Sequence, residues 1–153
     1  MALFLSTYTN RIDKKGRISL PAPFRTALGE DINQGIVVFR AHQHPCLEGF
    51  DWMKMDEIGD RMDHYDLFSQ QQDDLATTIF GESVQLFCDG DGRIVLPADL
   101  IEAAGLDEHA TFVGLGRKFQ IWSPELFAAR KAQARSAVLD QKLTIPQTGR
   151  EGA

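Results

Sequence analysis

The stretch DKKGRISLPAPFRTALG at residues 13–29 returns as DGDGRIVLPADLIEAAG at residues 89–105, so the chain carries one folding unit twice, 76 residues apart. The matching positions hold an aspartate, a glycine, an arginine, two aliphatic residues and a proline, whereas the positions between them differ. This spacing exceeds the 20–50-residue period of solenoids and propellers, and two copies are fewer than such stacks need. Two barrel-like or sandwich-like halves are the better interpretation.

Each copy predicts the order strand, strand, short helix, strand, strand. In the first copy, a strand within residues 3–12, a turn at 13–16 and the alternation of Ile18 and Leu20 predict a β-hairpin. Gly16 and Gly92 are expected to adopt a positive φ where each turn re-enters a strand. The other elements are short helices at 22–28 and 98–104, strands at 35–39, 46–50, 110–114 and 118–122, and helices at 52–64, 66–80 and 124–138.

Composition is that of an ordinary globular chain: 153 residues, 43% hydrophobic and 25% charged. A chain of this size buries enough surface to fold without disulfide bonds or a structural metal ion. The first five residues fit neither a signal peptide nor a membrane span, so we expect a cytoplasmic protein that does not contact the membrane. In that compartment Cys46 and Cys88 are expected to be free thiols.

The net charge of −6 of the whole chain argues mildly against nucleic-acid binding, but the charge is distributed unevenly along the sequence. Residues 1–29 carry +4, residues 30–91 carry −11 and residues 92–153 carry +1. Basic charge is therefore concentrated at the N-terminus.

Both copies contain Asp-x-x-Gly-Arg at the turn, which places a carboxylate four residues before a guanidinium. An ion pair between Asp13 and Arg17, and likewise between Asp89 and Arg93, would fix the arginine geometry. One interpretation is that both pairs are purely structural. Only the first turn is cationic, however, because Lys14 and Lys15 stand where the second copy has Gly90 and Asp91.

This first turn is a candidate phosphate-binding element, although a pair of lysines in a loop can also serve solubility alone. The candidate DNA-binding residues are Arg17, Lys14, Lys15, Arg11 on the preceding strand and Arg25 on the following helix. Arginine is also the side chain best suited to recognise guanine in the major groove. The candidate structural residues of the motif are Asp13, Gly16, Asp89, Gly92 and Arg93.

With its paired Asp-x-x-Gly-Arg-hydrophobic-x-hydrophobic-Pro motifs at this separation, the chain resembles the MraZ transcriptional regulators, which have two tandem SpoVT/AbrB-type units; the likeness covers about residues 4–138. The resemblance implies an α+β, mainly β fold in which swapped hairpins form one pseudo-symmetric β-barrel with flanking helices. Its units are expected at 7–54 and 83–126, followed by a C-terminal helix and flexible tail at 127–153.

The same resemblance implies a ring-shaped homo-oligomer that binds repeated boxes of double-stranded promoter DNA. Its expected role is a nucleoid-associated regulator, usually a repressor, of its own division and cell-wall gene cluster. By position, Arg17 is the leading DNA contact, with Lys14 and Lys15 as helpers. Asp91 makes the second turn acidic and speaks against a DNA role for Arg93 in the same subunit.

Other functions have weaker signals. His42, His44 and Cys46 alternate as metal ligands do, but Pro45 interrupts the strand and no fourth ligand is evident. Phosphate-binding glycine loops, dinucleotide motifs and nucleophile elbows are lacking, so we expect no enzyme, cofactor or small-molecule substrate. The alternative is an antitoxin-like protein-interaction module, indicated by the acidic middle and by apolar helix surfaces around Trp52, Met53, Met55 and Met62.

Overall fold

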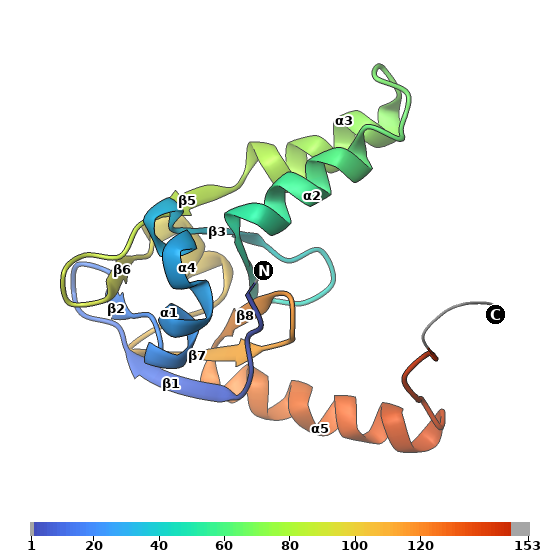
Figure 1. Ribbon diagram of the computed structural model, residues 1–153. Helices are drawn as coiled ribbons and strands as arrows, with labels where there is room; N and C mark the ends of the chain where they lie inside the picture. Colours follow the sequence, from blue (N-terminus) through green and yellow to red (C-terminus); the bar gives the residue numbers. More distant parts are fainter. Residues whose placement is uncertain (1, 148–153) are drawn as a thin grey trace.

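The computed structural model describes residues 2–147, and its order of elements follows the repeat (Figure 1). The first copy contains β1 (Thr7–Arg11), β2 (Arg17–Ser19), α1 (Ala22–Leu28), η1 (Gly29–Gln34), β3 (Ile36–Arg40) and β4 (Leu47–Asp51). The second contains β5 (Val84–Leu86), β6 (Arg93–Val95), α4 (Ala98–Ala103), β7 (His109–Gly114) and β8 (Phe119–Trp122). Between the copies lie α2 (Trp52–Met62), α3 (Gln70–Ala76) and η2 (Thr77–Gly81), and α5 (Pro124–Asp140) follows the second.

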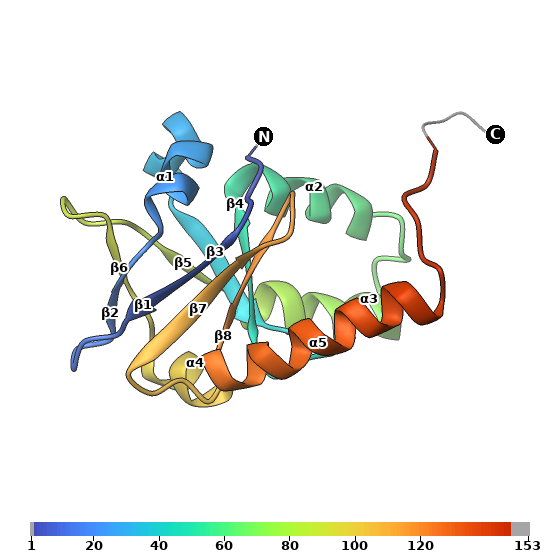
Figure 2. The ribbon, with the colours of Figure 1, turned by 90° about the horizontal axis from the view of Figure 1, so that it is seen from below.

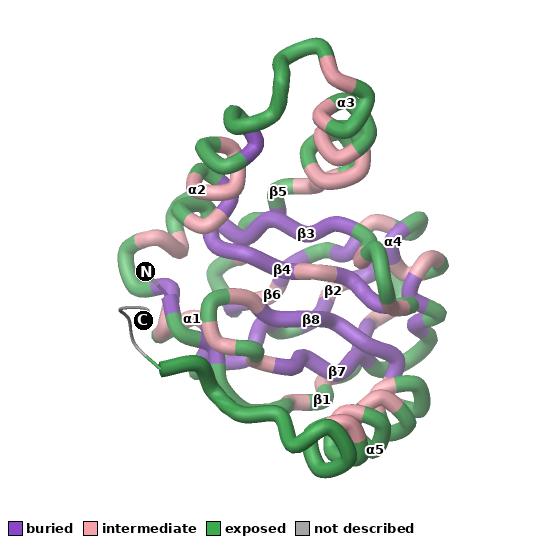
Figure 3. The backbone as a smooth tube through the Cα atoms, turned by 90° about the vertical axis from the view of Figure 1, so that its right-hand side faces the viewer, coloured by how far each residue is buried: buried purple, intermediate pink, exposed green. Residues whose placement is uncertain are grey.

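The strands form one antiparallel sheet with the order β1-β7-β8-β4-β3-β5 and a separate pair, β2-β6. Strands β1 and β5 are the two edges of the larger sheet, so it is not closed within the described residues. Helices α2, α3 and α5 lie over one face of this sheet (Figures 2 and 3). The α+β, mainly β class and the flanking helices are therefore confirmed.

The predicted β-hairpin at residues 3–20 is wrong in its pairing. The turn itself closes, because the Asp13 amide donates to the Arg17 carbonyl at 2.9 Å. Beyond it, however, β1 pairs with β7 and β2 pairs with β6, so both strands take partners from the second copy. This pairing sets Ile18 opposite Ile94, and both are almost fully buried. Burying these two apolar side chains against each other favours the exchange over a local hairpin.

The main core lies between the two copies. Phe24 of α1 packs against Phe4, Phe112 and Phe119, with ring centroids 5.1–6.2 Å apart. Phe112 and Phe119 belong to β7 and β8 of the second copy, so a helix of one copy fills the interior formed by strands of the other. Consequently neither copy has a separate core.

Two helix predictions need correction at their ends. The predicted helix at 66–80 begins only at Gln70, because the Ser69 hydroxyl caps it by accepting from the Gln72 amide at 3.1 Å, and its last turn is the π-helical η2. Ser123 caps α5, as the sequence indicates, but that helix continues to Asp140. Residues 141–147 of the predicted tail are exposed, and the rest of it lies outside the described residues. No helix among residues 2–147 is long and apolar enough to cross a membrane.

Candidate nucleic-acid interface

The turn at residues 13–17, hereafter the first tip, is built around the Asp13 carboxylate. One oxygen, Oδ1, accepts from the backbone amides of Lys15 at 2.9 Å and Arg17 at 2.8 Å. The other, Oδ2, accepts from Arg17 Nε at 2.6 Å. This leaves the two terminal nitrogens of Arg17 without a protein partner within the described part of the chain. The predicted ion pair is thus present, and it leaves the Nη1–Nη2 edge of a half-buried guanidinium free for a bidentate contact to guanine or phosphate.

These hydrogen bonds hold the Asp13 pKa below its ordinary value of 3.8. The Arg17 backbone amide is the largest cause, followed by the Arg17 guanidinium and the Lys15 amide. The Asp89 pKa is lowered in the same way, chiefly by the Arg93 amide. Because the folded-state pKa values are depressed, the stability that these carboxylates contribute is present above the unfolded pKa, near 4, and is lost as pH falls through the folded values.

Replacing Arg17 with alanine is expected to raise the Asp13 pKa only part of the way back to 3.8, because the backbone amide of residue 17, the largest cause of the shift, remains. A pH titration followed by the ¹³C resonance of the side-chain carboxyl measures this. The Asp89 carboxyl in the same sample is the control and should not change. Either a full return to 3.8 or an unchanged Asp13 pKa would contradict the assignment.

The turn at residues 89–93, hereafter the second tip, repeats this geometry but uses its arginine differently. Arg93 Nε donates to Asp89 at 3.1 Å and Nη2 donates to Asp91 at 3.2 Å. Residues 89–93 carry a net charge of −1, against +2 for residues 13–17. The guanidinium of Arg93 is therefore more fully occupied by carboxylates than that of Arg17.

The short sheet formed by β2 and β6, hereafter the ribbon, connects the two tips. Within it Ile18 and Ile94 point into the core, so Arg17 and Arg93 both lie on the opposite, outer face. Arg17 stands opposite Val95, two residues beyond Arg93, so the two arginines are diagonal neighbours with Cα atoms about 7–8 Å apart. Both tips project from the same side of the molecule, at its left in Figures 1 and 2.

Glycine is required at both tips for two reasons. Gly16 and Gly92 have φ values of +81° and +78°, as the sequence predicts. Each is also packed against the other copy: a Cβ at Gly16 would lie 2.7 Å from the Leu96 carbonyl oxygen, and one at Gly92 would overlap the Arg25 guanidinium.

The structure gathers four of the five candidate DNA-binding residues and separates the fifth. Lys14 and Lys15 are exposed at the first tip beside Arg17, and Arg11 is exposed at the end of β1 just before it. Arg25 instead lies against the second tip, where its guanidinium contacts Gly92. Sequence reasoning missed this because it assumed that the helix stays with its own turn. The repeat aligns Arg25 with Ile101 but does not tell which turn either side chain contacts. In the structure Ile101 makes the same exchange, because it contacts Gly16 at the first tip.

The other candidate sites do not assemble. The His42 ring lies near Phe39 and the His44 ring near Trp122, and no three metal-ligating side chains within residues 2–147 are grouped to hold an ion. Cys46 and Cys88 are both free. Burial raises the pKa of the Cys46 thiol to about 12, so this side chain is a small apolar group of the core.

Comparison with known proteins identifies the family of this chain. A family model described as "MraZ protein, putative antitoxin-like" matches residues 3–76 and again residues 79–147. The chain belongs to the MraZ family. Among its relatives are proteins named transcriptional regulator MraZ from Gluconacetobacter diazotrophicus, 40% identical over 98% of this chain and 96% of that protein, and from Gluconobacter oxydans, 43% identical over 89% and 85%. Another, from Rickettsia akari, is 37% identical over 95% of this chain and 97% of its own length.

Membership supports the repeat and a role in transcription regulation. The two matched segments of the MraZ model place the first tip in one and the second tip in the other. The duplication recognised from the motif is thus a property of the whole chain.

Proposed function

We propose that the protein is a sequence-specific DNA-binding regulator, a repressor of its own division and cell-wall gene cluster, that contacts promoter boxes through the first tip. The observation that carries this proposal is the Arg17 guanidinium, which Asp13 holds by Nε alone while Lys14 and Lys15 stand beside it without carboxylate partners within residues 2–147. The naming of the relatives as transcriptional regulators supports the same conclusion.

The ribbon has a suitable size for this role. The major groove of B-DNA is about 12 Å wide and admits a two-stranded β-ribbon. The exchanged pairings β1 with β7 and β2 with β6 also support a swapped-hairpin, pseudo-symmetric barrel as the scaffold, with units at 7–54 and 83–126. In this arrangement the core anchors one face of the ribbon, and the other face is presented to DNA.

One first tip binds weakly, because affinity for DNA depends on the number of phosphates neutralised and non-specific sites have Kd values of roughly 10⁻⁴–10⁻⁶ M. Several tips on one assembly raise the overall affinity by about 10²–10⁴ through effective concentration. A ring-shaped homo-oligomer bound to repeated promoter boxes brings several first tips to one DNA molecule and so raises the affinity in this way.

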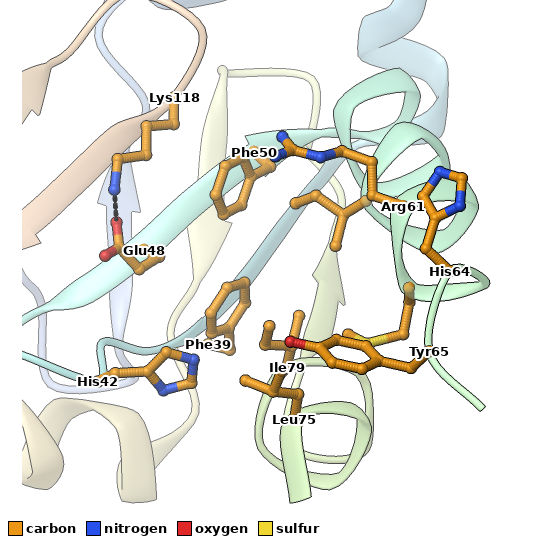
Figure 4. A pocket seen from close by; sticks show the side chains of 12 residues that line it. Phe39, His42, Glu48, Phe50, Arg61, His64, Tyr65, Leu75, Ile79 and Lys118 are labelled. Carbon is orange, nitrogen blue, oxygen red and sulfur yellow. Dashed lines mark hydrogen bonds and ion pairs between the residues drawn. The ribbon is translucent and has the colours of Figure 1, made fainter. Parts of the chain in front are cut away.

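The surface that supports self-assembly lies on the outer face of the sheet. A groove of about 570 Å³ runs between β3, β4 and the α2–α3 pair, lined by Phe39, Phe50, Ile58, Leu75 and Ile79, with the Glu48–Lys118 ion pair at one side (Figure 4). A second groove of about 580 Å³ shares Glu48 and Lys118 and continues between β7, β8 and α5. The two grooves share Glu48 and Lys118 and together form one trough, bounded by α2–α3 on one side and by α5 on the other. Figure 3 shows these helices on either side of the sheet.

A second copy of the chain carries two features complementary to this trough, an apolar projection and a negative charge. Leu67 and Phe68 lie in the α2–α3 connection with 68% and 90% of their surface exposed, so they form an apolar projection. Residues 52–76 carry a net charge of −5, whereas the trough wall formed by α5 carries Arg130, Lys131 and Arg135. A projection and a trough at different places on one molecule produce a head-to-tail contact, which closes into a ring when the rotation per subunit allows it.

Replacing Phe68 with aspartate is therefore expected to shift the oligomer toward monomer at micromolar concentration, because a charge would enter an apolar contact. Native mass spectrometry measures the distribution. Ile145→Asp, at a position 87% exposed in the C-terminal segment, is the matched control and should leave the oligomer unchanged. An unaltered oligomer in the Phe68 variant would contradict this use of the trough.

The second candidate function, an antitoxin-like interaction module, rests on the same trough with a different protein as occupant. Of the apolar helix surface indicated by the sequence, Trp52 and Met53 are exposed, whereas Met55 and Met62 are buried. Salt separates the two functions, because DNA affinity falls steeply with ionic strength and a largely apolar contact does not. Binding to DNA from immediately upstream of the protein's own gene, measured across a salt series, tests the regulator directly.

A further inference from the structure

We propose that the DNA site of each subunit extends across the ribbon to the second tip, where Arg25, supplied by the first repeat, binds a DNA phosphate. This inference rests on the proposed function. It adds a DNA contact at the second tip, although the acidic sequence of residues 89–93 taken alone predicts that this turn repels DNA. The decisive observation is that the exchange of strands moves a cation from one repeat to the turn of the other.

The displacement of Arg25 follows from the direction of the strands. At the far end of β2 from the first tip, the Leu20 amide donates to the Gly92 carbonyl at 3.0 Å, so the chain enters α1 beside the second tip. The Leu96 amide donates in the same way to the Gly16 carbonyl at 2.9 Å, so α4 begins beside the first tip. With a strand rise of about 3.3 Å per residue, residues 17–20 carry the chain about 10 Å from the first tip before α1 begins.

The contact itself is close. Gly92 is buried, and the space where a Cβ would stand at this position is filled by the Arg25 guanidinium. Arg25 also acts electrostatically on the neighbouring Cys88 thiol, opposing the rise that burial causes in its pKa. At the first tip the equivalent position is the neutral side chain of Ile101, so only the second tip receives a charged side chain from the opposite repeat.

The guanidinium of Arg25 is available for an anion. Arg93 is paired with Asp89 and Asp91, whereas Arg25 has no hydrogen-bonded or ion-paired carboxylate among residues 2–147. With Arg25 included, the net charge of the second tip rises from −1 to zero, which removes the repulsion of DNA inferred from its sequence. A planar guanidinium resting on a glycine, with its donors unpaired, fits a backbone phosphate.

In this proposal the two tips contribute differently to DNA binding. The first presents Arg17 with two lysines, a group suited to base recognition and strong electrostatic attraction. The second presents one cation next to a carboxylate-paired arginine, which suits a positioning contact to phosphate. Because both tips lie on one side of the molecule, a single duplex can meet both.

The test is the salt dependence of binding to duplex DNA from immediately upstream of the protein's own gene. Arg25→Gln is expected to reduce the slope of log K against log salt by about 0.9 for each engaged subunit, corresponding to a loss of roughly eightfold in affinity per subunit at 0.1 M salt. Arg25→Lys keeps the charge and should restore the wild-type slope. Arg40→Gln removes one exposed positive charge at the end of β3, away from both tips, and should leave the slope unchanged.

Melting temperature and oligomer size are measured for each variant, because Arg25 also packs on Gly92. An unchanged slope in Arg25→Gln, or the same reduced slope in Arg25→Lys, would overturn the phosphate contact. If Arg17→Ala loses binding while Arg25→Gln retains the wild-type slope, only the second-tip contact fails. If the wild-type protein shows no salt-dependent binding, the proposed function itself fails.

Discussion

Replacing Arg17 with alanine is expected to remove most of the affinity for promoter DNA while the oligomer stays intact. Asp13 holds the guanidinium by Nε and leaves its two terminal nitrogens without a partner among residues 2–147, so the substitution removes an oriented contact and leaves Asp13 as an unpaired negative charge at the tip. One such contact is worth about 1–3 kcal/mol. Two engaged subunits therefore lose about 2–6 kcal/mol, a decrease of roughly 30-fold or more in affinity.

Gel-shift titration measures the loss, and native mass spectrometry verifies the assembly. Arg40→Ala removes an exposed arginine outside both tips and should bind as the wild type does. If Arg17→Ala binds promoter DNA with unchanged affinity, the first tip is not the DNA site. If binding is lost only because the oligomer dissociates, Arg17 acts in assembly instead.

Replacing Phe24 with alanine is expected to cause a large loss of stability. Phe24 has no exposed surface and its ring contacts those of Phe4, Tyr8, Phe112 and Phe119. A buried phenylalanine replaced by alanine costs about 3–5 kcal/mol. In a chain of this length that lowers Tm by roughly 6–20 °C.

The same measurement tests whether the two copies fold as one unit. Because Phe24 belongs to the first copy and two of its partners to the second, unfolding should remain a single cooperative transition at the lower temperature. Phe87→Ala, at a side chain 56% exposed, is the matched control with a much smaller expected shift. Two separate transitions, with only one affected by Phe24→Ala, would show that the copies have independent cores.

Much of the local structure follows from local signals. The prolines and glycines that bound α1, the Ser123 cap of α5 and the positive φ of Gly16 and Gly92 depend on neighbours in the sequence, so each was predictable. The Asp13–Arg17 ion pair is of the same kind, because four residues at a tight turn bring the two groups together whatever the rest of the chain does.

The pairing of strands was not predictable in this way. A three-residue strand such as β2 carries a single buried side chain, Ile18, which is compatible with a local hairpin or with a partner 76 residues away. The choice depends on which pairing buries both isoleucines and lets Phe24 enter the core of the other copy. That is a property of the whole interior.

The duplication and the chemistry of the turns are evident from the chain alone, because they are properties of residues close together in it. One unit occurs twice, its turns carry a carboxylate, a glycine and an arginine, and only the first turn is rich in lysine. The exchange of strands between the repeats and the position of Arg25 beside Gly92 of the second turn depend instead on three-dimensional packing. Any partner of the right shape can bury an apolar surface, so the complete core, and not the residues of a short strand or helix, selects the contact that this element makes.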